Sequence, residues 1–344
     1  MSLNHRVVLA RRPTSLPVES DFALDAAPAP TPAAGQILVR TLYVSIDPGM
    51  RGWLLDAPNY SAPVPVGGPM RSFGIGEVAE SHNPAYAVGD LIVGMTGWQE
   101  WVVLDPTDVQ RRIPAGSGPL SAHLGVLGLT GLTAYVGMLE IGAPQPGETV
   151  LVSTAAGAVG SVAGQLAAIA GARTVGLTGS EEKRRLLLDR FGFDAAINYR
   201  SEPDLAAAIG RECPTGVDVY FDSVGGSMLD AALQHVNVGA RVPVCGTIGL
   251  PPGAVADGPR PERTILVKRL RVQGFIATDH FDRFDEIAGR LTDWLDSGRL
   301  THLEEIAPAL ADAPGALVRQ LAGENLGRSL VRIAADQPLS LSRP

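Results

Sequence analysis

A run of small residues, Ala155-Ala156-Gly157-Ala158-Val159-Gly160, follows the apolar segment Thr149–Ser153. The dinucleotide-binding fingerprint G-x-G-x-x-G has three glycines. Here Ala155 takes the first position, and Gly157 and Gly160 take the other two. Glycine at the second position lets the backbone approach a pyrophosphate, which the N-terminus of the following helix attracts. The run alone fits a tight strand-to-helix turn equally well. A buried strand before it and an amphipathic helix after it favour dinucleotide binding.

The end of the next expected strand indicates which dinucleotide binds. A site for NAD has Asp or Glu about 20 residues after the glycine turn, where it holds the ribose 2′-hydroxyl. Here the strand ends in Thr178-Gly179-Ser180, without an acid. Ser180 is expected to cap the following helix, and Lys183 falls in its first turn, where a cation is mildly unfavourable. A bound 2′-phosphate would reverse that penalty, so NADPH is expected. The alternative is that Lys183 is a solvated surface residue.

A parallel sheet must position these residues. Apolar strand segments alternate with helical segments, among them one that ends near Ala170 and one at 181–191. Such alternation is typical of a doubly wound parallel sheet of the Rossmann type in an α/β protein. The strands are expected at 149–153, 174–178, 195–198, 217–222, 241–245 and 270–277, and a further helix at about 282–297.

The first part of the chain, to about residue 120, has a different pattern. Short apolar segments separated by glycine and proline predict a β-rich, barrel-like domain. Ala26–Gly35 is expected to be a loop, and Ser329–Ile333 a strand near the end of the chain. The clearest short strands are expected at 36–40, 76–80, 90–94 and 101–104.

Composition narrows the classes of protein. With 344 residues and 45% hydrophobic residues the chain can form about two domains with sizeable cores. A net charge of −8 argues against nucleic acid as a partner. Two cysteines, Cys213 and Cys245, are too few for a disulfide framework. Residues 1–6 lack the apolar run of a signal peptide, and no apolar run is long enough to span a membrane. A cytoplasmic protein without a membrane partner is expected.

Five motifs occur in an order that is specific to one family. They are Leu42–Gly52, Gly128–Tyr135, Ala155–Gly160, Tyr220–Gly226 and Gly323–Arg328. With them the chain resembles the zinc-independent medium-chain dehydrogenases/reductases, in the branch of the prostaglandin reductases, plant alkenal double-bond reductases and bacterial curcumin reductase. The resemblance implies a GroES-like β-barrel-type domain at 1–124 and 308–344, a Rossmann NADPH-binding domain at 125–307, and a homodimer.

The resemblance also implies roles for individual residues. Lys183 and Tyr199 match residues that hold the 2′-phosphate of NADPH, and Ser223 stands where the family usually has Asn near a ribose. Asn325 matches an asparagine that reaches the cofactor from the C-terminal segment. Together with the glycine turn, the expected cofactor residues are Thr133, Gly157, Ala158, Val159, Gly160, Ser180, Lys183, Tyr199, Ser223, Val224, Cys245, Gly246, Phe275, Ile276, Ala277 and Asn325.

No metal is expected at the site. Zinc-dependent alcohol dehydrogenases hold zinc with an early Cys and a His-Glu pair. The comparable stretches here, Val44–Asp47 and Gly74–Glu77, contain neither a thiol nor an imidazole. The six histidines are scattered without a metal-ligand spacing.

The implied reaction is reduction of a carbon–carbon double bond conjugated to a carbonyl, in a small enone or enal. Hydride goes to the β-carbon and a proton to the α-carbon of the enolate. Tyr60 matches a tyrosine at the substrate pocket and is the expected catalytic residue. It fits a packing tyrosine on a surface loop equally well.

Two departures from the branch leave the proton donor and the substrate open. Gly49 and Pro251 stand where the branch commonly has tyrosine. The alternative functions are a zinc-free quinone reductase of the same superfamily and an NADPH-binding protein with little catalysis.

Overall fold

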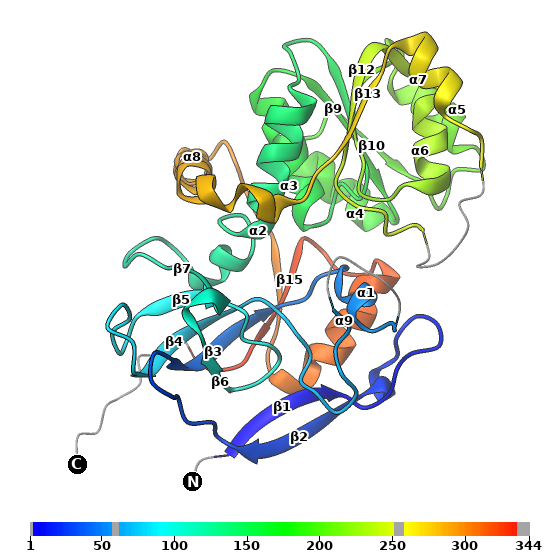
Figure 1. The fold of residues 1–344 in the computed structure, drawn as a ribbon. Coiled ribbons are helices and arrows are strands. Elements are labelled where there is room, and N and C mark those ends of the chain that lie inside the picture. The colour runs from blue at the N-terminus through cyan, green and yellow to red at the C-terminus, as the bar shows by residue number, and fades with distance from the viewer. Residues whose placement is uncertain (1–2, 57–61, 251–257, 336–344) are drawn as a thin grey trace. The chain divides into compact units, whose positions relative to one another are not determined.

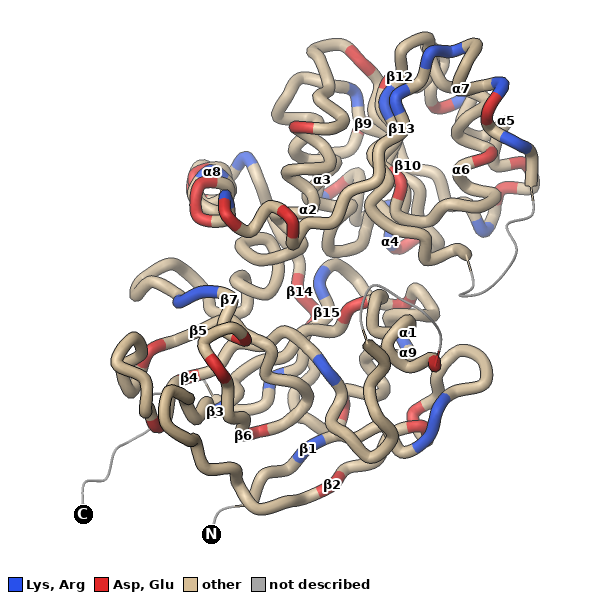
Figure 2. Tube along the Cα trace, in the orientation of Figure 1, with Lys and Arg blue, Asp and Glu red and all other residues tan. Residues whose placement is uncertain are grey.

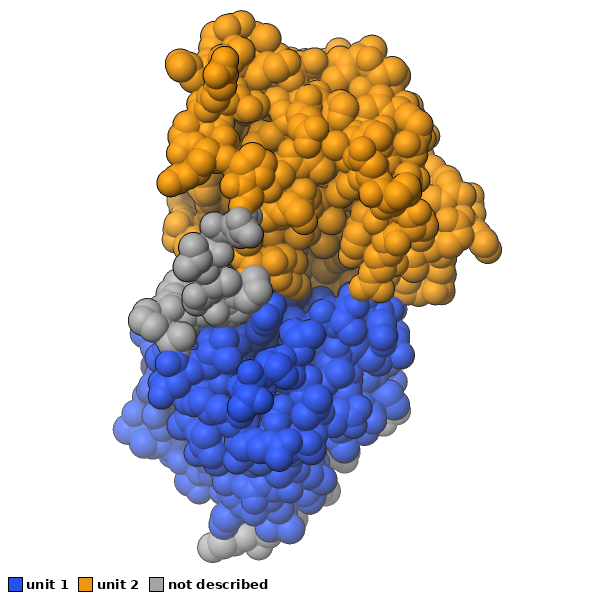
Figure 3. Space-filling model, turned by 90° about the vertical axis from the view of Figure 1, so that its right-hand side faces the viewer, with its two compact units in different colours: residues 1–124, 304–325, 329–344 blue, residues 125–303, 326–328 orange. Residues whose placement is uncertain are grey.

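The computed structural model describes residues 3–56, 62–250 and 258–335 (Figure 1). The chain divides into two compact units (Figure 3). The first comprises residues 1–124, 304–325 and 329–344, and the second residues 125–303 and 326–328. The domain boundaries expected from the sequence, after residues 124 and 307, stay a prediction. In the structure residues 304–307 form a strand in a sheet of the first unit.

The second unit is built on a parallel sheet. Its strands lie in the order β10-β9-β8-β11-β12-β13, and each neighbouring pair is parallel. The chain order reverses between β8 and β11, which is the topology of a doubly wound sheet. The Rossmann-type sheet expected from the sequence is therefore confirmed. The strands are β8 (Thr149–Val152), β9 (Arg173–Thr178), β10 (Ala195–Asn198), β11 (Val217–Phe221), β12 (Val236–Val244) and β13 (Arg271–Gly274).

Helices cover both faces of this sheet (Figure 1). Residues of α5 and α6 pack with Leu151, Val175 and Tyr220 in one apolar core. On the other face, Leu187 of α4 lies against Gly176 of β9. The helices are α2 (Leu129–Tyr135), its π-helical continuation η4 (Val136–Gly142), α3 (Ala158–Ile169), α4 (Glu181–Asp189), α5 (Leu205–Glu212), α6 (Gly226–Leu233), α7 (Glu262–Lys268) and α8 (Phe284–Asp296).

The first unit is rich in β-structure. A hairpin pairs β1 (Leu3–Leu9) with β2 (Phe22–Pro28). A larger sheet of the described residues has the order β14-β15-β3-β4-β5-β7, with β6 also paired to β3. Together with the parallel sheet of the second unit, this sheet confirms the expected fold class. The other elements are β3 (Ile37–Ser45), α1 (Met50–Trp53), β4 (Gly74–Ser81), β5 (Leu91–Gly94), β6 (Trp101–Leu104), β7 (Val109–Arg112), β14 (Glu304–Ala307), α9 (Ala313–Ala322) and β15 (Arg328–Arg332).

Several expected elements have other bounds in the structure; β12, expected at 241–245, already begins at Val236, and β3, expected at 36–40, continues to Ser45. Two further differences have a clear physical reason. The expected loop at Ala26–Gly35 begins later, because β2 continues to Pro28 through its pairing with β1, where Leu3 lies opposite Pro28. The expected strand at 270–277 is shorter. Phe275, Ile276 and Ala277 follow β13 rather than belonging to it, and a 3₁₀ turn begins at Ala277. In both places pairing partners decide the strand length, and local composition does not reveal them.

No helix of the described residues has both the length and the apolar character needed to cross a lipid bilayer.

A half-buried arginine stabilises the second unit at the end of η4. The Arg241 guanidinium on β12 donates to both carboxylate oxygens of Glu148, over 2.5 and 2.8 Å. It also donates to the carbonyl oxygens of Gly142 and Ala143, over 2.8 and 3.0 Å. Ala143 has the left-handed conformation that ends a helix, with φ of 43°. The arginine thus connects β12 to the last turn of η4 and to the residue before β8. Bidentate bonds of this kind are among the stronger polar interactions in proteins.

Glu148→Gln tests this connection through its pH dependence. The hydrogen bond from Arg241 lowers the pKa of the Glu148 carboxyl, so the ionised group stabilises the fold above its ordinary value of 4.5 and loses that effect as the pH falls below it. We expect Glu148→Gln to lower the melting temperature at pH 7, and the difference from wild type to shrink in acid. A difference that stays constant between pH 7 and the acid limit of folding would contradict this role.

Candidate cofactor site

The glycine turn connects β8 to α3. Thr154 has a left-handed conformation with φ of 44°, and Gly157 is the N-cap of α3 without any side-chain cap. A Cβ atom at Gly160 would collide with the Thr154 carbonyl oxygen, whereas one at Gly157 would lie 3.2 Å from it. Gly160 is therefore required by packing inside the protein. Gly157 leaves the entry to the helix N-terminus clear of side-chain atoms, which suits the approach of an anion.

Alanine at the first fingerprint position is explained by the neighbouring strand. Ala155 is fully buried, and its N–H donates to the Leu177 carbonyl oxygen over 3.0 Å. The Ala155 methyl group lies 2.8 Å from the position that a Cβ of Gly176 would take. Ala155 thus replaces the first glycine of the fingerprint, and Gly176 on β9 leaves room for the Ala155 methyl group.

The C-terminal segment completes the turn. Gly327 lies beside Gly157 in an isolated parallel bridge, and its N–H donates to the Ala156 carbonyl oxygen over 3.0 Å. Gly327 has φ of 65°, and a Cβ there would collide with the Leu303 carbonyl oxygen. The glycine of the motif Gly323–Arg328 is therefore needed both for its conformation and for its close packing.

A serine connects the two strands at which the chain order reverses. The Ser153 hydroxyl, just after β8, donates to the Phe221 carbonyl oxygen over 3.1 Å. It accepts from the Ser223 N–H over 2.8 Å. In doubly wound sheets, ligands bind beyond the carboxyl ends of the strands at this reversal. Ser153 thus fixes the backbone of Ser223, one of the expected cofactor residues, at that point.

Asp222 is a further residue of this region that the sequence analysis did not single out. Its Oδ1 atom accepts from the Tyr220 hydroxyl and from the N–H groups of Val224 and Gly225, over 2.9 to 3.0 Å. The side chain is fully buried, and burial raises the pKa of its carboxyl. Its Oδ2 atom has no hydrogen-bond partner among the described residues. Asp222 therefore shapes the turn after β11 that carries Ser223 and Val224. The signal in the sequence was an acid directly after the three consecutive hydrophobic residues Val219, Tyr220 and Phe221.

Ser180, Lys183 and Tyr199 come from the ends of β9 and β10. Ser180 caps α4 as expected, because its hydroxyl accepts from the Lys183 N–H over 3.2 Å. Tyr199 directly follows β10, and its N–H donates to the Thr178 carbonyl oxygen over 2.9 Å. The Tyr199 hydroxyl lies 2.9 Å from the position that a Cβ of Gly179 would take. The ends of the two strands thus bring the expected 2′-phosphate residues to one side of the sheet.

The remaining expected residues of the second unit follow the other strands. Ser223 and Val224 follow β11, Cys245 and Gly246 follow β12, and Phe275–Ala277 follow β13. The carboxyl ends of parallel strands share one edge of the sheet, so these residues lie along that edge. Burial raises the pKa of the Cys245 thiol to about 11, which leaves it a neutral group at pH 7. Its sulfur lies 3.5 Å from the Ser223 hydroxyl oxygen.

Thr133 lies on α2, and its hydroxyl donates to the Leu129 carbonyl oxygen over 2.7 Å. Four residues later, Gly137 allows the helix to lie against the strands, because a Cβ there would be 2.6 Å from ring carbons of Phe221 and Phe275. Gly137 therefore sets the close packing of this helix, which carries Thr133, against the sheet.

The other expected residues lie elsewhere. Asn325 is buried and belongs to the first unit. Gly49, also of the first unit, precedes α1 with a right-handed helical conformation. Tyr60, the expected catalytic residue, and Pro251 lie outside the described residues. The role of Tyr60 stays a prediction.

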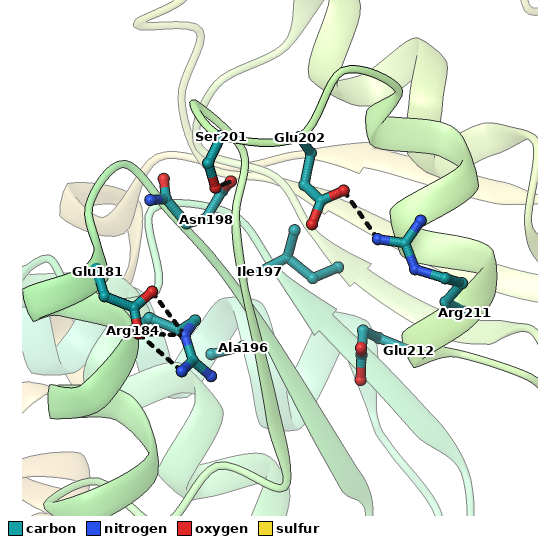
Figure 4. Close-up of a pocket in the computed structure, with 9 residues that line it drawn as sticks. All are labelled: Glu181, Arg184, Ala196, Ile197, Asn198, Ser201, Glu202, Arg211 and Glu212. Atoms are coloured by element: carbon teal, nitrogen blue, oxygen red, sulfur yellow. Dashed lines mark hydrogen bonds and ion pairs between the residues drawn. The ribbon is translucent and has the colours of Figure 1, made fainter.

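A polar hollow of about 250 Å³ lies at the β10 edge of the sheet (Figure 4). Two ion pairs line it: Arg184 donates to Glu181 within α4, and Arg211 of α5 donates to Glu202 over 2.8 Å. Of its other lining residues, Asn198 directly precedes the turn that carries Tyr199. The lining of the hollow is therefore mainly polar and charged, unlike the mainly apolar pockets that hold small organic substrates.

Among the residues that the structure describes, no three or more His, Cys, Asp or Glu side chains are grouped as metal ligands would be. The expectation of a zinc-free site stays a prediction.

Comparison with known proteins identifies the class of protein. Residues 5–111 match a family model described as the N-terminal domain of oxidoreductase, and residues 158–294 match one described as zinc-binding dehydrogenase. The chain is 39% identical to the NADPH-dependent curcumin reductase of Escherichia coli, with 97% of this chain and 98% of the relative covered. It is 36% identical to the 2-alkenal reductase (NADP⁺-dependent) of Nicotiana tabacum, with 97% and 98% covered.

Solved structures agree with this result. The crystal structure of CurA from Vibrio vulnificus in complex with NADPH matches with a TM-score of 0.90 and 36% identity, covering 96% of this chain and 99% of that one. The chain therefore belongs to the medium-chain dehydrogenase/reductase superfamily of oxidoreductases. Within it, the chain belongs to the branch that contains the curcumin, alkenal and prostaglandin reductases. The resemblance on which the expected residues depend is thus confirmed.

Two glycine variants separate packing from binding in the glycine turn. Gly160→Ala forces the backbone of the turn to move, and we expect a loss of about 1–3 kcal/mol in the free energy of unfolding. Gly157→Ala brings its methyl group to 3.2 Å from the Thr154 carbonyl oxygen, a tight contact that a small shift relieves. It should cost about 1 kcal/mol or less, while its methyl group obstructs the pyrophosphate. Urea unfolding and NADPH titration measure the two effects. Unchanged NADPH affinity in Gly157→Ala would exclude the close approach.

Proposed function

We propose that the chain is an NADPH-dependent reductase of carbon–carbon double bonds conjugated to a carbonyl group. The observation that carries the choice of cofactor is the end of β9. There Gly179 faces the Tyr199 hydroxyl, and Ser180 and Lys183 begin the next helix, where a site for NAD would have an acid. The names of the curcumin and 2-alkenal reductases, which match over nearly their full length, support both the cofactor and the kind of substrate.

The residues of the second unit fit such a cofactor. The N–H groups of Ala158, Val159 and Gly160 form the first turn of α3, where a helix has no acceptors of its own for them, and they would bind the pyrophosphate. Lys183, Tyr199 and Ser180 would hold the 2′-phosphate. The ribose and nicotinamide would lie along the edge near Thr133, Ser223, Val224, Cys245, Gly246, Phe275, Ile276 and Ala277. Asn325, which belongs to the first unit, stays an expected cofactor residue.

NADPH supplies the hydride for the β-carbon of the substrate when it is bound. Negative charge then develops on the carbonyl oxygen of the substrate, which needs a hydrogen-bond donor, and the α-carbon needs a proton. A tyrosine hydroxyl can donate that hydrogen bond and can pass a proton onward. We assign this role to Tyr60. Burial keeps the Cys245 thiol protonated at pH 7, because it raises the pKa of this group to about 11.

Steady-state kinetics test the reaction. We expect NADPH oxidation to accompany formation of the saturated ketone or aldehyde from an enone or enal. Tyr60→Phe should lower kcat by about 10- to 1,000-fold and leave the KM for NADPH nearly unchanged, because only the proton donor is lost. NADPH oxidation with a quinone as the substrate tests the alternative function of a quinone reductase. Turnover with quinones and none with activated alkenes would exclude the proposal, and an unchanged kcat in Tyr60→Phe would remove Tyr60 from the mechanism.

We also propose that the chain forms a homodimer through β13. This strand is the edge of the parallel sheet, paired only with β12 among the described strands, and its four residues are exposed. An exposed edge strand offers unpaired N–H and C=O groups to another strand. Large apolar side chains are also exposed around it. Examples are Leu266 of α7 at 76%, Ile276 at 51% and Val272 of β13 at 44%. A second copy of the same edge would cover these side chains and pair the strands about a twofold axis.

Val272→Lys tests this interface because it places a charge in the middle of the edge strand. We expect the variant to be a monomer at concentrations where the wild type is a dimer, as measured by light scattering after size-exclusion chromatography. Val88→Lys, on an exposed residue of the first unit, is the matched control and should remain dimeric. A dimeric Val272→Lys variant would place the interface elsewhere.

A further inference from the structure

The turn after β10 carries a second cationic side chain beside Tyr199. We infer that Arg200 binds the 2′-phosphate together with Tyr199 and Lys183, and that it contributes much of the preference for NADPH over NADH. The inference rests on the cofactor proposed above, and it adds a residue for which neither the sequence motifs nor the family resemblance predicted a role.

Backbone hydrogen bonds hold the turn in place. The Asn198 side-chain oxygen accepts from the Arg200 N–H over 3.2 Å. The Asn198 carbonyl oxygen accepts from both the N–H and the hydroxyl of Ser201, over 3.0 Å each. On the other side, Tyr199 is bound to Thr178 of β9 through its N–H. The positions from which the side chains of Tyr199 and Arg200 project are therefore fixed relative to the end of β9.

Both side chains extend over Gly179. A Cβ atom at Gly179 would lie 2.9 Å from the Tyr199 hydroxyl oxygen and 3.3 Å from Arg200 Nε. The hydroxyl and the guanidinium thus both lie over a residue without a side chain, at the strand end where an NAD-binding protein would have its acid. A guanidinium offers several N–H groups in a planar fork that matches the oxygens of a phosphate. Where an NAD-binding protein has a carboxylate that accepts hydrogen bonds, this strand end has two hydrogen-bond donors, the Tyr199 hydroxyl and the Arg200 guanidinium.

The nearby acids have partners of their own. Glu181 accepts from Arg184 over 2.8 and 2.9 Å and also lies 3.8 Å from Arg185. Glu202, which closely follows the turn, accepts from Arg211 (Figure 4). Basic and acidic residues therefore lie side by side around α5 and the turn before it (Figure 2). These pairs offset the negative charge that would otherwise oppose a phosphate beside Lys183 and Arg200.

Binding of two nucleotides that differ only in the 2′-phosphate tests the inference. The probes are 2′,5′-ADP and 5′-AMP, titrated calorimetrically into the full-length protein. We expect Arg200→Gln to weaken 2′,5′-ADP by about 10- to 100-fold, the range for a lost charged hydrogen bond, and to leave 5′-AMP unchanged. Arg200→Lys should retain part of the affinity, because it keeps the charge and loses the fork. Arg319→Gln, which removes an exposed arginine of the first unit bound to Glu305, is the control and should behave as wild type.

The outcomes are distinct. If wild type prefers 2′,5′-ADP and Arg200→Gln keeps that preference, the inference is wrong and the cofactor proposal stands. An equal loss for both nucleotides would show general damage to the site and would also overturn it. If wild type binds the two equally, the cofactor proposal itself fails.

Gly179→Ala provides a second variant that should fold. Its methyl group would meet only the ends of two flexible side chains, and Gly179 has no positive φ, so the backbone can accept alanine. We expect an unchanged melting temperature together with a loss of affinity for 2′,5′-ADP comparable to that of Arg200→Gln. Retention of full affinity would show that the two side chains need not lie over Gly179.

Discussion

The start of α3 lies so close to the turn before it that no side chain fits between Gly160 and the Thr154 carbonyl oxygen. This approach determines where the helix N-terminus lies relative to β8. It also leaves Ala155 buried beneath the turn and the Ala156 carbonyl directed to Gly327. Every polar contact proposed for the pyrophosphate depends on that placement, because N–H groups and the helix dipole act over only a few ångströms. Packing thus sets the position of the helix N-terminus, and the electrostatic attraction for the pyrophosphate depends on that position.

Charged and polar side chains lie at two further places along the same edge of the sheet. At one, the ends of β9 and β10 bring a hydroxyl, an ammonium and a guanidinium to the start of α4. At the other, the reversal of strand order is held by the Ser153 hydroxyl and by the buried Asp222 carboxyl, which organise the turn after β11. The first group is exposed enough to meet a phosphate. The second is buried and acts on backbone N–H groups, so its effect on a ligand is indirect.

Local sequence was sufficient for the features that depend on neighbours in the chain. The glycine turn, the capping serine at 180 and the alternation of strands and helices follow from spacing of a few residues. Features that depend on pairing across the sheet were not predictable in this way. Gly176 compensates for Ala155, Arg200 reaches Gly179, and the strand at 270–277 ends at Gly274, all because of residues on other strands. The family resemblance added residues such as Asn325, which no local pattern would have selected.

The bond from Gly327 to Ala156 joins residues that are 171 positions apart in the chain. During synthesis on a ribosome the strand, the turn and the helix around Gly157 emerge first, and the partner of the Ala156 carbonyl emerges only 171 residues after it. Contacts between such distant residues form late, because a long loop must close first. The nascent protein therefore has a partly finished cofactor turn until Gly327 has also been added.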